Sequence, residues 1–403
     1  MFLALTKPKE RRKSAPLITT RNSRECCPRT CETAEPGCSE RNENETSPLV
    51  LQLREELEKT RLDNERTPSP YYEPLNIVQS RKQQRSLSKQ KRRSNTTAEI
   101  TPHKYTDDPL IAWEMIKNNR PVKAMKLSTP IRHDAVRFVC MACIHQSFPD
   151  PQFIPPGDIL IVAGDFTLYG RPDEVELFSK YLKQLPHTLK VVIAGNHEYT
   201  FDDRFMKAHG SKFGEKKLAV KQTLSNEFSL QEMKNAKAKL ENVIYLEDSS
   251  SELFGIRIYG TPWLPEYDDM AFNLPRGQAL LDKWNDIPAG IDVLITHTPP
   301  LGHGDILSTG EHVGCVELLN SVVKRIRPKY HIFGHIHSGY GCTTDGYTKF
   351  VNCSLVDDRL QLVNNPIIFD ISVDENKKER WTYKYPNMIM MIVIDICDYA
   401  DNK

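Results

Sequence analysis

Four short apolar runs constrain the fold of this chain most strongly, because polar side chains follow each of them directly. Runs of this length predict buried strands of an α/β sheet, and ligands bind at the carboxyl ends of such strands. We therefore expect the polar groups to meet at one edge of a sheet. The runs are residues 158–163, 190–194, 291–296 and 330–333, and they lead into Gly164-Asp165, Gly195-Asn196-His197-Glu198, His297 and Gly334-His335-Ile336-His337.

The segment between the first two runs predicts a parallel pair of strands. Residues 171–185 place Val175, Phe178, Leu182 and Leu185 on one face of a helix. A strand–helix–strand order joins its two strands in parallel. Further helices are expected at 229–240, 277–284 and 316–326, and further strands at 136–141 and, around a polar turn at 247–251, at 242–246 and 253–259. Short strands at 347–353, 360–363 and 366–371 are expected to form a second sheet that closes a sandwich.

Composition divides the chain into a folded domain and two flanking segments. Hydrophobic residues make up 39% of the 403 residues, which is below the share typical of globular domains. Residues 1–105 are rich in polar and charged side chains and show no lasting apolar period, so they predict a disordered arm. We expect the folded domain at residues 122–372 and a tail, apolar in part, at 373–403.

Two features of the arm allow more than one interpretation. Its cysteines lack the partners of a zinc knot and are interpreted as unstructured thiols; they are Cys26, Cys27, Cys31 and Cys38. Between Arg81 and Arg93 the arm carries seven Lys or Arg residues and no acid. Such a stretch is a solvated basic tail, or it contacts anionic surfaces or nuclear-import receptors.

The apolar runs and the cysteines also indicate in which cellular compartment the protein is expected. No apolar stretch approaches the roughly 20 residues that a bilayer span needs, and a net charge of +1 gives no overall field toward nucleic acid or membrane. The ten cysteines lack the regular spacing of a secreted scaffold. We expect a reducing, cytoplasmic setting, with the nucleus as the alternative.

The groups at the strand ends are ligands for divalent metal ions. Asp165 offers an anionic oxygen that can bridge two ions, Asn196 a neutral oxygen, and His297, His335 and His337 imidazole nitrogens. This mixed set suits manganese, iron, nickel or zinc better than calcium or magnesium. Two ions about 3.5 to 4 Å apart hold a bridging hydroxide and clamp a phosphoryl oxygen for in-line attack.

His197 and Glu198 have a separate expected role. His197 follows a ligand directly and need not be one itself. It is a candidate to protonate the leaving oxygen or to stabilise the phosphoryl charge. Glu198 is expected to orient the His197 imidazole, as carboxylates behind a metal site do.

These motifs resemble the signature of the calcineurin-like metallophosphoesterases, and further stretches resemble the metallophosphoesterase domain-containing proteins of animals. The resemblance covers roughly residues 132–371. It implies a four-layer α/β/β/α sandwich and a di-metal phosphodiesterase that acts on nucleotides such as cyclic nucleoside monophosphates, with manganese as the expected metal and iron or zinc as alternatives. The further stretches are residues 137–140, 156–160, 272–278, 313–320 and 339–341, the last of which makes Tyr340 a candidate substrate contact beside His197 and Asn196.

The chain departs from this family at its first motif, Asp-x-His. The corresponding stretch is Cys143-Ile144-His145, so that His145 matches but Cys143 stands in place of the aspartate. A thiolate can ligate and would favour zinc or iron. Alternatively, Cys143 is a small buried residue and the first metal is held weakly.

Two hypotheses about function follow from this departure. The first is a working metallophosphoesterase, slow if the first metal is weak, whose second metal has Asp165, Asn196, His297 and His335. The second is a nucleotide-binding or scaffold pseudoenzyme with an impaired first site and a basic arm. The complete second set favours the enzyme, whereas Cys143 favours the binding protein.

Overall fold

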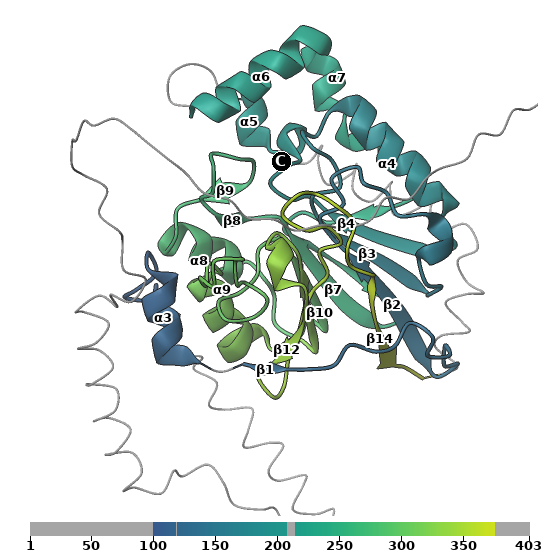
Figure 1. The fold of residues 1–403 in the computed structure, drawn as a ribbon, viewed down its shortest axis with the longest axis vertical. Coiled ribbons are helices and arrows are strands. Elements are labelled where there is room, and N and C mark those ends of the chain that lie inside the picture. Colours follow the sequence, from purple (N-terminus) through teal and green to yellow (C-terminus); the bar gives the residue numbers. More distant parts are fainter. Residues whose placement is uncertain (1–99, 118, 208–213, 375–403) are drawn as a thin grey trace, which may run out of the picture. The chain divides into compact units, whose positions relative to one another are not determined.

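Two β-sheets packed face to face form the centre of the computed structural model, which describes residues 100–117, 119–207 and 214–374 (Figure 1). One sheet has the strand order β14-β2-β3-β4-β5, with β2 to β5 parallel and β14 antiparallel to β2. The other has the order β1-β12-β13-β11-β10-β7-β6, and its strands β13, β11, β10 and β7 are parallel. The first sheet comprises β2 (Ala135–Met141), β3 (Ile159–Ala163), β4 (Leu189–Ile193), β5 (Ile244–Tyr245) and β14 (Ile367–Ser372). The second comprises β1 (Arg120–Pro121), β6 (Ser249–Leu253), β7 (Ile256–Thr261), β10 (Val293–Thr296), β11 (Tyr330–Phe333), β12 (Gly341–Thr344) and β13 (Lys349–Asn352).

Alternate side chains of the central strands pack on opposite faces of each sheet. In β2, Phe138 and Cys140 belong to the apolar cluster between the two sheets, whereas Val139 and Met141 belong to the cluster that includes the helices. All seven residues of β2 are buried. Parallel strands covered on both faces are apolar at nearly every position; the buried exception in β2 is Arg137, which forms an ion pair with Asp370. This is why the strands appear in the sequence as continuous apolar runs.

Helices cover the outer faces and complete a four-layer α/β/β/α sandwich (Figure 1). Helix α4 (Pro172–Gln184) buries Val175, Phe178 and Leu182, as its apolar face predicts. Beyond the other sheet, α8 (Gln278–Asn285) buries Leu280 and Trp284 beside α9 (Val316–Ser321). A π-helical turn, Val322–Ile326, continues α9.

The region between β4 and β5 is more helical than its sequence pattern indicates. Helix α6 (Glu215–Glu227) buries only Leu224, so it lacks the apolar stripe by which a helix is recognised. The helix expected at 229–240 is shorter, and consists of α7 (Leu230–Lys234) and a 3-10 turn at Lys237–Lys239. A short helix, α5 (Asp203–Lys207), precedes them.

The hairpin expected around residues 247–251 is wrong. Strand β6 begins inside that polar segment, and its hairpin partner is β7. The turn is made by Phe254 and Gly255, whose φ angles of 55° and 75° lie in the left-handed region. Type I′ hairpin turns require positive φ at both central residues. Strand β5 pairs with β4 instead, so it lies in the other sheet.

The C-terminal strands do not form a sheet of their own, contrary to expectation. Strand β13 joins β11 in the seven-stranded sheet, and β14 pairs over its whole length with β2 in the five-stranded one. Residues 360–363 contribute only a bridge between Val356 and Leu362. Register and sheet partner depend on contacts far apart in the chain, which the local pattern does not contain.

The folded part begins before the expected boundary at residue 122. An N-terminal strap, residues 100–117 and 119–121, contains α3 (Pro109–Ile116) and β1, which pairs with β12. In α3, Trp113 packs on the backbone of Gly302, where a Cβ would lie 2.2 Å from the ring, and on His312 with ring centroids 4.5 Å apart. Asn119 also donates to the carbonyl of Gly302. The strap thus supports the loop 302–313.

We expect Trp113→Ala to lower the free energy of unfolding by about 2 kcal/mol, less than for a fully buried Trp because the ring is half-buried. Met115→Ala, a change at an exposed site of the same helix, is the matched control and should cost less than about 0.5 kcal/mol. Urea unfolding of both variants measures the difference. Equal stabilities would mean that the strap does not support the domain.

Most of the expected arm lies outside the described residues, including its cysteines and the basic stretch between Arg81 and Arg93. The apolar part of the tail also lies outside them. In the part of the chain that the structure describes, the helices are too short or too polar to cross a bilayer. The cytoplasmic compartment stays a prediction.

Candidate metal centre

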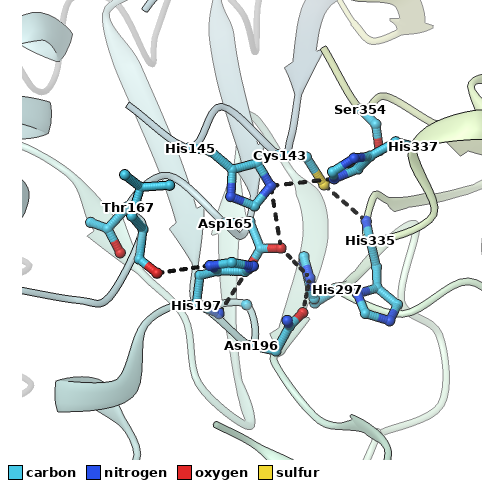
Figure 2. Close-up of polar contacts among 12 residues, drawn as sticks. Cys143, His145, Asp165, Thr167, Asn196, His197, His297, His335, His337 and Ser354 are labelled. Atoms are coloured by element: carbon cyan, nitrogen blue, oxygen red, sulfur yellow. Dashed lines mark hydrogen bonds and ion pairs between the residues drawn. The ribbon is translucent and has the colours of Figure 1, made fainter. Parts of the chain in front are cut away.

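The polar groups at the four strand ends lie close together, at the point where the carboxyl ends of strands from both sheets meet (Figure 2). The expectation of one sheet edge is therefore wrong: β3 and β4 belong to one sheet, and β10 and β11 to the other. Asp165 and His335 have φ angles of 55° and 66°, and His145 has 45°. Left-handed backbone at non-glycine residues costs free energy and gathers at functional sites.

One group of ligand atoms surrounds Asp165 on the side of β10. The Oδ2 atom of Asp165 lies 3.1 Å from Nε2 of His297, and that nitrogen lies 2.8 Å from Oδ1 of Asn196. Asp165, His297 and His335 place one ligand atom each within 4.8 Å of one another. The amide of Asn196 donates to the sulfur of Met270 at 3.0 Å, which directs its oxygen toward His297.

A second group lies on the other side of Asp165, toward β2. The Nε2 atoms of His145 and His337 face each other at 3.3 Å, and His145 Nε2 lies 3.8 Å from Asp165 Oδ2. The sulfur of Cys143 lies within 4.8 Å of the ligand atoms of both histidines. Cys143 thus occupies the position that the motif comparison predicts. Its sulfur accepts from the backbone N–H of His335 and from Ser354 Oγ, at 3.0 and 3.4 Å.

The hydrogen bonds of the histidines show that these groups fit a cation. Nδ1 of His297 donates to the carbonyl of Ala163 at 2.9 Å, so Nε2 faces two oxygen acceptors. Nδ1 of His337 donates to the carbonyl of Asp357 at 3.0 Å, so its Nε2 presents a lone pair to His145. Several buried acceptors that point at one another are satisfied by a positive charge between them.

The electrostatics of the site agree with a metal-ligand role for three of its four candidate ligand histidines and differ at His297. Burial lowers the pKa of His145 and of His335 to about 3, and lowers that of His337. These imidazoles are neutral at pH 7, as metal ligands must be. Burial opposes charge on His297 and Asp165, but their ion pair outweighs it: the pKa of His297 is raised and that of Asp165 lies well below its ordinary value.

Cys143 is the exception among the ligand candidates. Burial, together with the nearby Asp165 carboxylate, raises the pKa of the Cys143 thiol well above its ordinary value. A neutral thiol is a poor metal ligand, because the thiolate is the form that binds. The φ angle of Cys143 is 50°, a region in which aspartate is enriched among non-glycine residues.

Glu198 orients backbone rather than the His197 ring, contrary to expectation. Its carboxylate accepts from the N–H groups of Gly195, Asp165 and Thr167 at 2.6, 3.0 and 2.9 Å, and from Thr167 Oγ1 at 2.8 Å. Burial and Asp165 raise the pKa of Glu198 to about 7. The His197 ring is held by the carbonyl of Leu168, 2.8 Å from Nδ1. Glu198 thus joins the loops after β3 and β4.

We expect Glu198→Gln to lower the free energy of unfolding by about 2 kcal/mol, because its amide N–H groups would face buried donors and leave them unpaired. Metal affinity should fall roughly 10- to 100-fold, since the change disturbs groups that orient ligands. Urea unfolding and metal titration measure the two effects. Glu252→Gln, on an exposed position of β6, is the control. If Glu198→Gln is as stable as this control, the carboxylate does not organise the site.

A cavity of about 510 Å³ opens over the ligand groups. Asp165, Asn196, His197, His335 and His337 line one part of it. The rest is lined by residues that sequence reasoning missed, among them Tyr267, Arg276, Thr298 and Thr309. They lie in loops. Arg276 falls within the stretch 272–278 that resembles the family, but nothing in that stretch marks its side chain as a site residue.

Tyr340 is not among the residues that line this cavity. It lines a neighbouring hollow of about 320 Å³ with Ser338 and Asp357, and its hydroxyl donates to the carbonyl of Asn365 at 2.8 Å. The ring packs against the cluster between the sheets. The candidate role of Tyr340 in substrate binding is therefore not supported by its position.

Comparison with known proteins agrees with the ligand geometry. The model of the calcineurin-like phosphoesterase family matches residues 136–339, which include every strand end described above. The chain belongs to the calcineurin-like metallophosphoesterases. It is 55% identical to a UPF0046 protein of Caenorhabditis elegans, over 72% of this chain and 74% of that protein. It is 44% identical to metallophosphoesterase domain-containing protein 1 of Homo sapiens, over 69% of this chain and 86% of that protein.

These relatives place the chain in the metallophosphoesterase domain-containing family, as its motifs predict. Membership implies a divalent metal cofactor, and supports hydrolysis of phosphoric esters as the general class of reaction. The groups of ligand atoms on either side of Asp165 are the candidates to hold that cofactor.

Proposed function

We propose that this metallophosphoesterase is a phosphodiesterase that holds two divalent ions and hydrolyses nucleotide phosphoesters, including cyclic nucleoside monophosphates. The observation that carries the proposal is that ligand atoms lie on both sides of Asp165 at the wall of one cavity. The ligand atoms of His297 and His335 lie within 4.8 Å of that of Asp165 on one side, and that of His145, which also neighbours His337, does so on the other. A carboxylate shared by two groups is what a two-ion site requires. We propose manganese as the metal, as the family resemblance implies, with iron or zinc as alternatives, because a mixed nitrogen and oxygen set suits all three.

The residues of each group have distinct roles in this proposal. Asn196, His297 and His335 hold one ion with Asp165, and His145 and His337 hold the other, with Cys143 as a weak ligand. When bound, two such ions supply a nucleophilic hydroxide at neutral pH and stabilise charge on the phosphoryl oxygens.

We propose that His197 acts on the leaving group. Its Nδ1 must carry a proton, because it lies 2.8 Å from the carbonyl of Leu168, which only accepts. The ring lines the cavity, and its backbone N–H donates to Oδ1 of Asp165 at 3.0 Å. In its imidazolium form, Nε2 has a proton to give to the leaving oxygen. The hydrogen bond to Leu168 keeps the ring in one orientation while it does so.

Hydrolysis of bis-p-nitrophenyl phosphate tests the proposed reaction. The purified full chain should hydrolyse it with added manganese, lose activity in excess chelator, and regain it when manganese is restored. If the protein at saturating manganese is no faster than a metal-free blank, the hypothesis of a working enzyme is rejected.

A second candidate function is supported by Cys143. The protonated, fully buried thiol weakens the group of ligands beside it, so a nucleotide-binding or scaffold pseudoenzyme is the alternative. The same assay separates the two hypotheses, since a pseudoenzyme binds nucleotide without turning over bis-p-nitrophenyl phosphate. Contacts of the basic arm with anionic surfaces or import receptors stay a prediction.

A further inference from the structure

The cavity extends beyond the metal ligands to Tyr267, an exposed aromatic side chain. Tyr267 lies in the loop between β8 (Leu264–Pro265) and β9 (Asn273–Leu274) and is 58% exposed (Figure 1). Its ring lies nearly perpendicular to the ring of His335, at 5.6 Å between centroids and 83° between planes. An aromatic ring exposed at the wall of an active-site cavity leaves a π-face to which a planar ligand can bind.

The loop fixes the position of Tyr267. Its carbonyl accepts from the backbone N–H of Met270 at 3.2 Å and from the side chain of Asn273 at 2.8 Å. Met270 is the residue whose sulfur accepts from Asn196. The backbone that carries Tyr267 is therefore tied to the ligand group, so that a ring stacked on Tyr267 would stand at a defined place relative to the reacting phosphate.

Arg276 brings a fixed cation to the same cavity. Its Nη1 and Nη2 atoms donate to the carbonyls of Gly314 and Val313 at 2.9 and 2.7 Å. A guanidinium has five N–H donors, so three remain after these two contacts. Arg276 forms no ion pair with any carboxylate among the residues that the structure describes. Its remaining donors are available to hydrogen-bond acceptors of a ligand in the cavity.

We propose that Tyr267 and Arg276 form a base-recognition subsite that prefers guanine nucleotides, an inference that rests on the proposed nucleotide phosphodiesterase function. Guanine presents two neighbouring acceptors, O6 and N7, which match the donors of a guanidinium. Adenine presents a donor, its N6 amino group, beside N7, and this repels an arginine N–H. Tyr267 supplies the stacking surface, which serves either base.

Rates with cyclic GMP and cyclic AMP test the subsite in the manganese-loaded full chain. We expect kcat/KM to be about 10-fold higher for cyclic GMP, and Arg276→Gln to reduce this ratio to about one or below, because a glutamine amide can pair with N6 and N7 of adenine. Tyr267→Leu should raise KM about 10-fold for both nucleotides and change kcat less, and Tyr267→Phe should restore the KM because it keeps the ring. Tyr347→Leu and Arg257→Gln, at an exposed tyrosine and an exposed arginine that do not line the cavity, are controls that should keep the wild-type ratio.

Equal rates with both nucleotides in the wild type, or a preference that persists in Arg276→Gln, would overturn the proposal. If the chain hydrolyses neither nucleotide, the proposed reaction fails, but the subsite is still tested by calorimetric binding of GMP and AMP. The same variants should then change the dissociation constants in the same pattern. Equal binding of GMP and AMP by the wild type would reject the subsite as well.

Discussion

Asp165→Asn should reduce hydrolysis of bis-p-nitrophenyl phosphate by at least about 100-fold. A ligand atom of Asp165 lies within 4.8 Å of those of His297 and His335, and within 4.8 Å of that of His145, so its loss should weaken both ions together. Even residues that only hydrogen-bond to a metal ligand typically change metal affinity or activity 10- to 100-fold. His297→Ala should have an effect of similar size, because it removes the nitrogen that lies 3.1 Å from Asp165 and 2.8 Å from Asn196.

The control for this substitution is Asp282→Asn, at a position of α8 whose carboxylate bonds only to Gln278 among the described residues. Its rate should equal that of the wild type. Metal content measured on the same samples shows whether the variant has lost its ions. Circular dichroism shows separately whether it has kept its fold. Wild-type rates in Asp165→Asn would show that the shared carboxylate is not part of the reaction.

Cys143→Asp should raise both manganese affinity and turnover, by about 10-fold or more. Manganese prefers hard oxygen ligands and binds thiol sulfur poorly, and the burial that keeps Cys143 protonated weakens it further. The surroundings accept a carboxylate, because the N–H of His335 and the hydroxyl of Ser354 already donate to the sulfur. The left-handed backbone at this position also suits aspartate better than cysteine.

The prediction is tested best by comparing the effect of Cys143→Asp with manganese and with zinc. With zinc the gain should be smaller, since thiolate is a good zinc ligand. Cys143→Ser, which keeps the size but adds no charge, is the control and should not raise the rate with manganese. Titrations of both ions against the three proteins measure the effect. If metal content and rate are unchanged in Cys143→Asp with both ions, Cys143 does not contribute to the site.

The four strands that carry the ligands could be predicted because their burial on both faces leaves continuous apolar runs in the sequence. The proximity of Asp165, Asn196, His297 and the His335–His337 motif followed from their position directly after these runs. What the pattern could not supply was the sheet to which each strand belongs. That choice depends on packing between segments far apart in the chain. The prediction that the four strand ends lie at one edge of a single sheet was therefore wrong.

The rest of the site could not be predicted from the sequence pattern. Tyr267 and Arg276 lie in loops, where no period marks a functional residue, and their role depends on which cavity the loop reaches. Tyr340 stood beside the motif in sequence, but its hydroxyl turns to Asn365. Glu198 adjoins His197, yet within the described part of the chain its carboxylate accepts from Gly195, Asp165 and Thr167 and not from His197. Adjacency in sequence predicted the wrong partner in both cases.

Anomalous scattering from crystals grown at saturating manganese tests the central claim most directly. We predict two peaks for each chain, one among Asp165, Asn196, His297 and His335, and one among Asp165, His145 and His337. Elemental analysis of the same protein should give about two manganese ions per chain, and about one or none in Asp165→Asn. The absence of any peak beside Asp165, or ions bound only elsewhere in the molecule, would contradict a two-ion metallophosphoesterase.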